Sequence, residues 1–298
     1  MASSMDPTRL TRVLGRSREG IHVLGSADVP AFLELTARDP VVNVFAEHRA
    51  RTTNLEPRWL GGEVWGLFRK GQLLAGCHLG ANLVPVGCDA EQAAMFARHA
   101  LGHAPRQGRD VATLVGPRLA VETIWNAVAD VWGEARDERW DQPHLQIARA
   151  PDVPPDSAVT PTRRQDLEIL YPACVAMYRE EVGADPESGG PRGLYRTRVE
   201  QLVGKGWSFS RIEGDQVVFK AEVACVSPYA AQVQGVWVNP RHRGRGLAAP
   251  GMAAVVEHVR RTIAPVVSLY VNAWNTPARR AYDAVGFEQT ATFATVMF

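Results

Sequence analysis

The chain has 298 residues, which corresponds to about two domains of ordinary size. Its 33 Lys and Arg residues against 32 Asp and Glu residues leave a net charge of +1. This balance excludes a protein that binds a polyanion through its overall charge, so no nucleic-acid partner is expected. Apolar residues make up 46% of the chain, as in a soluble globular protein with a substantial core.

Targeting and redox signals are weak in this sequence. The first residues lack the apolar segment of a signal peptide. A long stretch without Lys, Arg, Asp or Glu, residues 71–88, is interrupted by Pro85 and several glycines, so no membrane partner is expected. The four cysteines lie far apart and form no C-x-x-C pair, which is typical of reduced thiols in a cytoplasmic protein.

Hydrophobic periodicity and turn residues predict a mixed α/β order in the first 150 residues. The expected elements are a strand at 21–24, helical segments within 28–48, a hairpin around residues 70 and 71, a helix at 89–101, a strand at 111–115 and a helix at 118–132. Three prolines then fall within residues 150–157. This run predicts a stiff linker at 151–158.

The remaining residues, 159–298, predict a similar order of elements. These are a strand at 159–162, helices at 166–181 and 194–203, strands at 207–212, 216–226 and 230–238, a glycine-rich loop with a helix to about 263, a strand at 266–271, a helix at 277–285 and a strand at 290–298. We therefore expect an α/β fold with two copies of one plan, in domains 1–150 and 159–298. Each copy is a mostly antiparallel sheet flanked by helices.

One segment of the second half predicts chemistry. A strand ending near Val238 runs into Arg241-x-x-Gly244-x-Gly246 and then into a helix. Glycines let a ligand approach the backbone, and a helix N-terminus attracts anions, so the segment predicts a pyrophosphate site. A solvated basic loop is the simpler alternative. A dinucleotide site, suggested by Gly244-x-Gly246-x-x-Ala249, is disfavoured because residues 263–274 hold no Asp or Glu.

With a second motif, this segment resembles the GNAT N-acetyltransferase superfamily. The second motif is a strand, Asn275, a helix with Ala278 and Tyr282, and then Gly286 and Phe287. Asn275, Ala278, Tyr282 and Gly286 stand at helical offsets that share one face. The resemblance covers about residues 159–298 and implies an acetyl-CoA cosubstrate. It implies cofactor contacts by residues on the strand, in the loop and after the next strand: Val236, Trp237, Val238, Arg243, Gly244, Arg245, Gly246, Leu247 and Asn275.

The resemblance also implies catalytic groups. Tyr282 matches the tyrosine that protonates the departing thiolate in many relatives, with a packing tyrosine as the alternative. The strand before the loop carries Gln232 and Gln234 where many relatives have a glutamate base. Glu222, on the neighbouring strand, is the best carboxylate candidate, and a structural salt bridge is its alternative. Glu180 and Glu181 end a helix that commonly sets acceptor specificity in the family, or they are simply solvated.

The first half lacks a comparable loop. Residues 86–92 contain one glycine and no arginine, and the acidic residues Asp89 and Glu91 would repel a pyrophosphate. This half resembles an uncharacterised N-terminal domain found before acetyltransferase domains in actinobacterial proteins. The tandem design is similar to the mycothiol synthase family. We expect 1–150 to be a degenerate GNAT-like domain without a cofactor loop.

The combined prediction is an acyl-CoA-dependent N-acyltransferase that moves acetyl to a primary amine by direct attack. The acceptor stays open between a small molecule, such as an amino sugar or a cysteinyl conjugate, and a protein or peptide amine. A non-catalytic acyl-CoA sensor is the alternative. His99 and His103 are spaced like a metal pair but lack an evident third ligand, so no metal is expected. The oligomeric state stays open.

Overall fold

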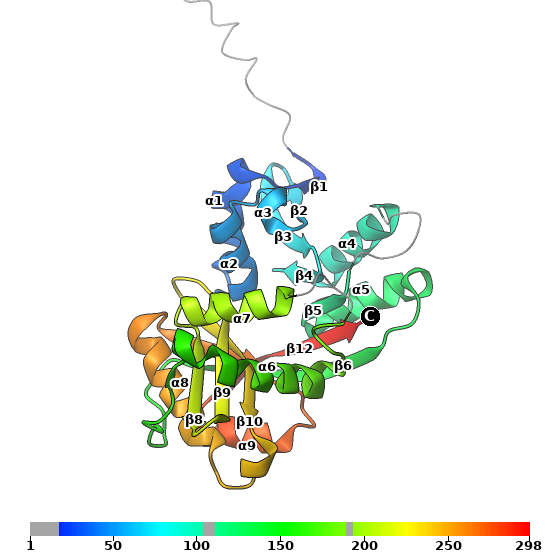
Figure 1. Cartoon of the computed structure of the whole chain (residues 1–298). Coiled ribbons are helices and arrows are strands. Elements are labelled where there is room, and N and C mark those ends of the chain that lie inside the picture. Colours follow the sequence, from blue (N-terminus) through cyan, green and yellow to red (C-terminus); the bar gives the residue numbers. More distant parts are fainter. Residues whose placement is uncertain (1–17, 104–110, 189–192) are drawn as a thin grey trace, which may run out of the picture. The chain divides into compact units, whose positions relative to one another are not determined.

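The computed structural model describes residues 18–103, 111–188 and 193–298 (Figure 1). The chain forms two compact units. Unit 1 comprises the described residues within 1–38, 49–137 and 296–298, and unit 2 comprises those within 39–48 and 138–295. The first unit therefore includes the last three residues of the chain, and the second includes a ten-residue segment from the N-terminal half.

Unit 1 contains a five-stranded sheet in the order β1-β2-β3-β4-β5. Strands β1 to β4 pair antiparallel, and β4 pairs parallel with β5. The strands are β1 (Gly20–Val23), β2 (Glu63–Arg69), β3 (Gln72–Leu79), β4 (Asn82–Val86) and β5 (Thr113–Pro117). The helices are η2 (Ser26–Asp28), α1 (Val29–Thr36), α3 (Pro57–Leu60), α4 (Ala90–His103) and α5 (Arg118–Trp132), while α2 (Val44–Thr53) begins in unit 2 and ends in unit 1.

Unit 2 contains a sheet in the order β12-β6-β11-β10-β9-β8-β7. Its strands are β6 (Asp137–Ile147), β7 (Thr160–Pro161), β8 (Ser208–Glu213), β9 (Gln216–Val226), β10 (Ala230–Val238), β11 (Val266–Tyr270) and β12 (Glu288–Met297). Its helices are η3 (Arg164–Asp166), α6 (Leu167–Val182), α7 (Leu194–Gly204), η4 (Pro240–His242), α8 (Ala248–Thr262) and α9 (Thr276–Val285). Strands β10 and β11 are parallel, with α8 as their crossover.

Two apolar layers hold the unit 2 sheet between helices. One joins the strands to α8 and α9 through buried residues such as Met252, Val256 and Val285. The other joins α6 and α7 to the sheet through residues such as Met177 and Trp237. Figure 1 shows α6 and α7, in green, lying across the yellow strands. The 3.6-residue spacing of apolar residues on α8 gives this helix one buried face.

Strand β6 is the main element that the sequence does not predict. Asp137–Ile147 includes Pro143 and several charged residues, yet it pairs antiparallel with β11. The compact units divide at 137/138, so all of β6 except Asp137 belongs to unit 2. The proline-rich segment after it contacts unit 2, where the Asp152 amide donates to the Val285 carbonyl at 3.0 Å.

Three further expectations concern thiols, membranes and metals. All four cysteines are free thiols. None of the described helices is long and apolar enough to cross a membrane. The described residues form no cluster of three or more His, Cys, Asp or Glu side chains placed to hold a metal ion. The His99 ring lies edge-on to Trp65, and the side chain of His103 lies outside the described residues.

Candidate functional site

The site is built where two parallel strands of unit 2 separate. Strands β10 and β11 pair only over residues 230–232 and 266–268. Beyond Gln232, β10 stays paired with β9 on one side while β11 no longer pairs with its other edge. The register with β9 shifts between Gln234 and Trp237, where Gly235 adopts a φ of +59°. No other described strand pairs with this edge of β10, so it can accept an extended ligand as an additional strand.

The loop after β10 leads into an uncapped helix. Gly244 and Gly246 have φ values of +75° and +72°, a backbone region that other residues rarely adopt. Leu247, at the N-cap of α8, makes no side-chain capping bond, and the first turn holds no acidic residue. The first amide groups of α8 and the positive end of its dipole are therefore available to an anion.

Arginine 243 connects this loop to α6. Its Nε donates to the Val238 carbonyl at 3.0 Å, and its guanidinium forms an ion pair with Glu180 at 2.5 Å. The other Glu180 oxygen accepts from Trp237 Nε1 at 3.1 Å. Arg245 is exposed on the same loop. The loop thus carries cationic side chains beside the free end of α8.

Helix α9 positions Asn275 and Tyr282, the two candidate site residues of the second motif. Asn275 is its N-cap, and the Asn275 Oδ1 accepts from the Ala278 amide at 3.3 Å. Tyr282 is 6% exposed and packs edge-on against Phe287. Burial raises the pKa of Tyr282, so its phenol keeps its proton at neutral pH. In the described part of the chain this hydroxyl makes no hydrogen bond, so it is available to a ligand.

Sequence comparisons identify the domain around this site. Residues 193–287 match the acetyltransferase (GNAT) family, and residues 62–170 match a domain of unknown function (DUF4081). The C-terminal region carries a GNAT acetyltransferase domain. A mycothiol acetyltransferase from Brachybacterium faecium is 30% identical over 173 residues, which cover 58% of this chain and 44% of that protein. The chain thus spans less than half the length of this curated relative.

Solved structures support the GNAT fold over most of the chain. A GCN5-related N-acetyltransferase from Sphaerobacter thermophilus has a TM-score of 0.58 at 20% identity, covering 93% of this chain and 94% of that chain. A tandem GNAT protein from the clavulanic acid biosynthesis pathway has a TM-score of 0.52 at 16% identity, covering 93% and 98%. These similarities confirm the expected fold class, a mixed α/β structure with tandem GNAT-like domains.

Both oxygens of the Glu222 carboxylate, inside the GNAT domain, accept hydrogen bonds. Lys220 Nζ donates to Oε2 at 3.2 Å, and Gln234 Nε2 donates to Oε1 at 2.9 Å. Lys220 is fully buried and also donates to the Gly235 carbonyl at 3.1 Å. Burial opposes the charge of Lys220, but the nearby Glu222 carboxylate outweighs it and the pKa of Lys220 is raised. This buried ion pair fixes the β10 bulge.

The sequence motifs do not point to Lys220 or to the role of Gly235. One signal for Lys220 is present in the sequence. A lysine two residues before a glutamate on an apolar strand shares its face with that glutamate, because side chains alternate along a strand. The bulge at Gly235 has no comparable local signal. It follows from the pairing of β10 with β9.

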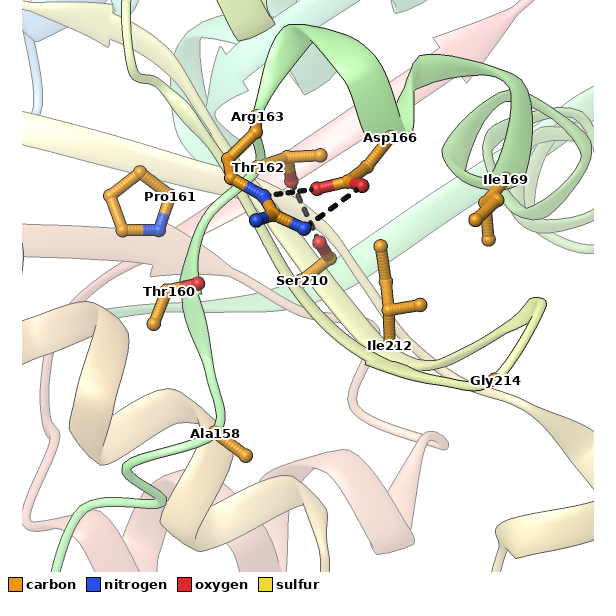
Figure 2. Close-up of a pocket in the computed structure, with 10 residues that line it drawn as sticks. All are labelled: Ala158, Thr160, Pro161, Thr162, Arg163, Asp166, Ile169, Ser210, Ile212 and Gly214. Atoms are coloured by element: carbon orange, nitrogen blue, oxygen red, sulfur yellow. Dashed lines mark hydrogen bonds and ion pairs between the residues drawn. The ribbon is translucent and has the colours of Figure 1, made fainter.

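A separate hollow of about 400 Å³ lies beside β7 and β8 in unit 2 (Figure 2). Figure 2 shows Arg163 and Asp166 facing each other there, with a hydrogen bond of 2.7 Å between Nε and Oδ2. The Thr162 and Ser210 hydroxyls lie 2.9 Å apart. These polar groups satisfy one another, and none of the predicted site residues lines this hollow.

Proposed function

We propose that the GNAT domain transfers an acetyl group from acetyl-CoA to a primary amine by direct attack. The observation that carries this proposal is the unpaired edge of β10, which runs into the uncapped N-terminus of α8. An extended pantetheine arm fits the first feature and a pyrophosphate fits the second. The neighbouring helix α9 carries Tyr282, whose hydroxyl has no hydrogen bond in the described part of the chain.

Each part of the site has a distinct role in this proposal. The backbone of Val236, Trp237 and Val238 holds the pantetheine arm, and the amides of residues 243–247 hold the pyrophosphate. Asn275 keeps its Nδ2 for the cofactor while its Oδ1 caps α9. Proximity and a β10 amide that polarises the thioester carbonyl supply most of the rate. Tyr282 donates its proton to the departing sulfur.

The acceptor in this proposal is a small-molecule amine. The relative from Brachybacterium faecium is named for acetylation of mycothiol. Deacetylated mycothiol therefore belongs in the first pool of amines to be tested, beside amino sugars, cysteinyl conjugates, peptides with free amino termini and lysine peptides.

A non-catalytic acyl-CoA sensor is the second candidate, and Glu222 is the observation that favours it. Both oxygens of this carboxylate are held by Lys220 and Gln234. A carboxylate held in this way has no free oxygen for an incoming amine. A sensor would bind acetyl-CoA with the same strand edge and helix end and would release no thiol.

Thiol release from acetyl-CoA, measured against the pooled amines, tests the proposal. We expect amine-dependent release by the wild type and a loss of about 100-fold or more in kcat for Tyr282→Phe. Acetyl-CoA affinity should stay unchanged in this variant. Tyr229→Phe is the matched control, because Tyr229 is 45% exposed and belongs to none of the site elements. Tight acetyl-CoA binding without release from any pool would support the sensor instead.

A further inference from the structure

Two adjacent carboxylates at the end of α6 differ in their partners. Glu180 is occupied by Trp237 and Arg243. The Glu181 carboxylate makes no hydrogen bond or ion pair in the part of the chain that the structure describes. Its backbone carbonyl, by contrast, is anchored by Arg139 at 2.8 Å. The main chain at Glu181 is therefore held while its side chain stays available.

The face of α6 that carries Glu181 is the face that covers the β10 bulge. Cys174, Met177 and Glu181 stand at helical offsets of three and four residues, so they lie along one side of the helix. A methyl group on Gly235 would lie 3.1 Å from Met177 Cε. Glu181 is therefore placed one turn beyond the residue that packs on the bulge, toward the separation of β10 and β11.

The charged and titratable groups around Glu181 come from several elements. They are Arg139 on β6, Lys220 and Glu222 on β9, Tyr270 on β11 and Tyr282 on α9. Although the residue is exposed, the surrounding protein partly desolvates the carboxylate and raises the pKa of Glu181. The same carboxylate contributes to the raised pKa of Tyr282, after the larger effect of burial. Glu181 is thus electrostatically coupled to the hydroxyl assigned to the sulfur.

We propose that Glu181, and not Glu222, accepts the proton of the incoming amine. This inference rests on the proposed acetyl transfer and assigns its missing base. Glu222 has both oxygens occupied. Glu181 is exposed, its carboxylate has no partner among the described residues, and it lies on the face of α6 that carries Met177. A carboxylate also attracts the ammonium form of the amine to this side of the sheet.

The proton balance of the step is complete with these two side chains. The ammonium gives one proton to the Glu181 carboxylate, and the neutral nitrogen then attacks the thioester carbonyl carbon. The C–N bond forms, the C–S bond breaks, and its electron pair leaves with sulfur. The thiolate takes the Tyr282 proton, and the second proton lost by the nitrogen returns to Tyr282. Glu181 finally releases its proton to water.

The test is the pH dependence of kcat/KM for acetyl transfer to the best amine of the pool. The wild type should lose activity as the pH falls through the raised pKa of Glu181, because the protonated carboxyl accepts no proton. Glu181→Gln should lower kcat/KM by about 100-fold or more. It should also abolish the loss of activity at low pH, which is the acid limb of the profile. Acetyl-CoA affinity should not change, and Glu181→Asp should restore part of the limb.

Two variants control for helix and charge effects. Glu168→Gln, at the other end of α6, removes an exposed partner of Arg196 and should leave the profile unchanged. Glu222→Gln, in protein shown by circular dichroism to be folded, should keep the acid limb. An unchanged profile in Glu181→Gln would overturn this inference alone. A wild type without amine-dependent release would overturn it together with the proposed function.

Discussion

The two units contain the same strand–helix–strand arrangement, but the helix N-terminus is capped in unit 1 and uncapped in unit 2. In unit 1, β4 leads into α4 and then into the parallel strand β5. The Asp89 Oδ1 accepts from the Gln92 amide at 2.8 Å, and the Gln92 Oε1 accepts from the Asp89 amide at 3.0 Å. This reciprocal capping satisfies α4 internally. In unit 2, α8 has no such cap.

The edges of β4 and β10 also differ in how well they can bind a ligand. In unit 1, Pro85 on β4 has no amide hydrogen to offer a ligand. Its ring also packs against Gly116 on β5, where an added methyl group would lie 3.2 Å from Pro85 Cδ. In unit 2, the corresponding edge of β10 beyond Gln232 is unpaired. One unit satisfies this arrangement with its own side chains, whereas the other leaves both the strand edge and the helix end to a ligand.

The largest effect is expected from a negative charge in the unit 2 loop. Gly244→Glu places a carboxylate beside the amides assigned to the pyrophosphate, so acetyl-CoA affinity should fall by about 100-fold or more. A 100-fold loss corresponds to roughly 2.7 kcal/mol of binding free energy. Gly206→Glu is the matched control, because Gly206 has a φ of +69° and equally open surroundings but lies between α7 and β8. Isothermal titration measures both. Equal losses in the two variants would show that backbone strain, not charge, causes the effect.

The next effect is the pH dependence of stability, because each unit contains a buried histidine. His78 on β3 and His144 on β6 are buried, and desolvation lowers the pKa of each to about 4. Because unfolding restores an ordinary pKa, the unfolded chain binds more protons between pH 6.5 and 4. Stability should therefore fall as the pH drops from 7 to 5, by about 2 kcal/mol for each histidine.

Replacing either histidine isolates its contribution. His78→Gln and His144→Gln should each flatten the pH dependence of the unfolding free energy measured in urea. An unchanged slope in either variant would mean that its histidine titrates normally in the folded chain.

A smaller effect is expected at the capped helix of unit 1. Asp89→Ala removes the side-chain acceptor of the Gln92 amide and should cost about 1 kcal/mol in unfolding free energy. Acetyl-CoA affinity should stay the same, because this helix end holds no ligand in our account. A loss of affinity in the folded variant would place the cofactor, at least in part, on unit 1.

The smallest effect comes from the reverse change in unit 2. Ala248→Glu adds an acidic residue to the first turn of α8, which should stabilise the helix by about 0.5 kcal/mol through its dipole. The same charge should weaken acetyl-CoA binding. Thermal unfolding and titration of one preparation measure both quantities. A gain in stability and in affinity together would separate the α8 N-terminus from the cofactor.

Local sequence patterns predict most helices and strands. The features that they do not predict depend on contacts between residues far apart in the chain. The helix at 118–132 and the strands at 216–226 and 230–238 have the expected bounds, because periodicity and turn residues lie within each segment. Strand β6 is polar and contains Pro143, and its conformation depends on pairing with β11 far along the chain. Residues with local motifs, such as Gly244 and Tyr282, were identified as candidates. The bond between Arg243 and Glu180 joins residues 63 apart and has no local signal.

The stoichiometry of acetyl-CoA binding shows whether the cofactor lies at the open helix end of unit 2. Isothermal titration of the full chain should give one acetyl-CoA per chain, and Gly244→Glu should weaken that binding by about 100-fold or more. Two molecules per chain, or one that binds Gly244→Glu with unchanged affinity, would contradict the assignment of the cofactor to the open helix end of unit 2.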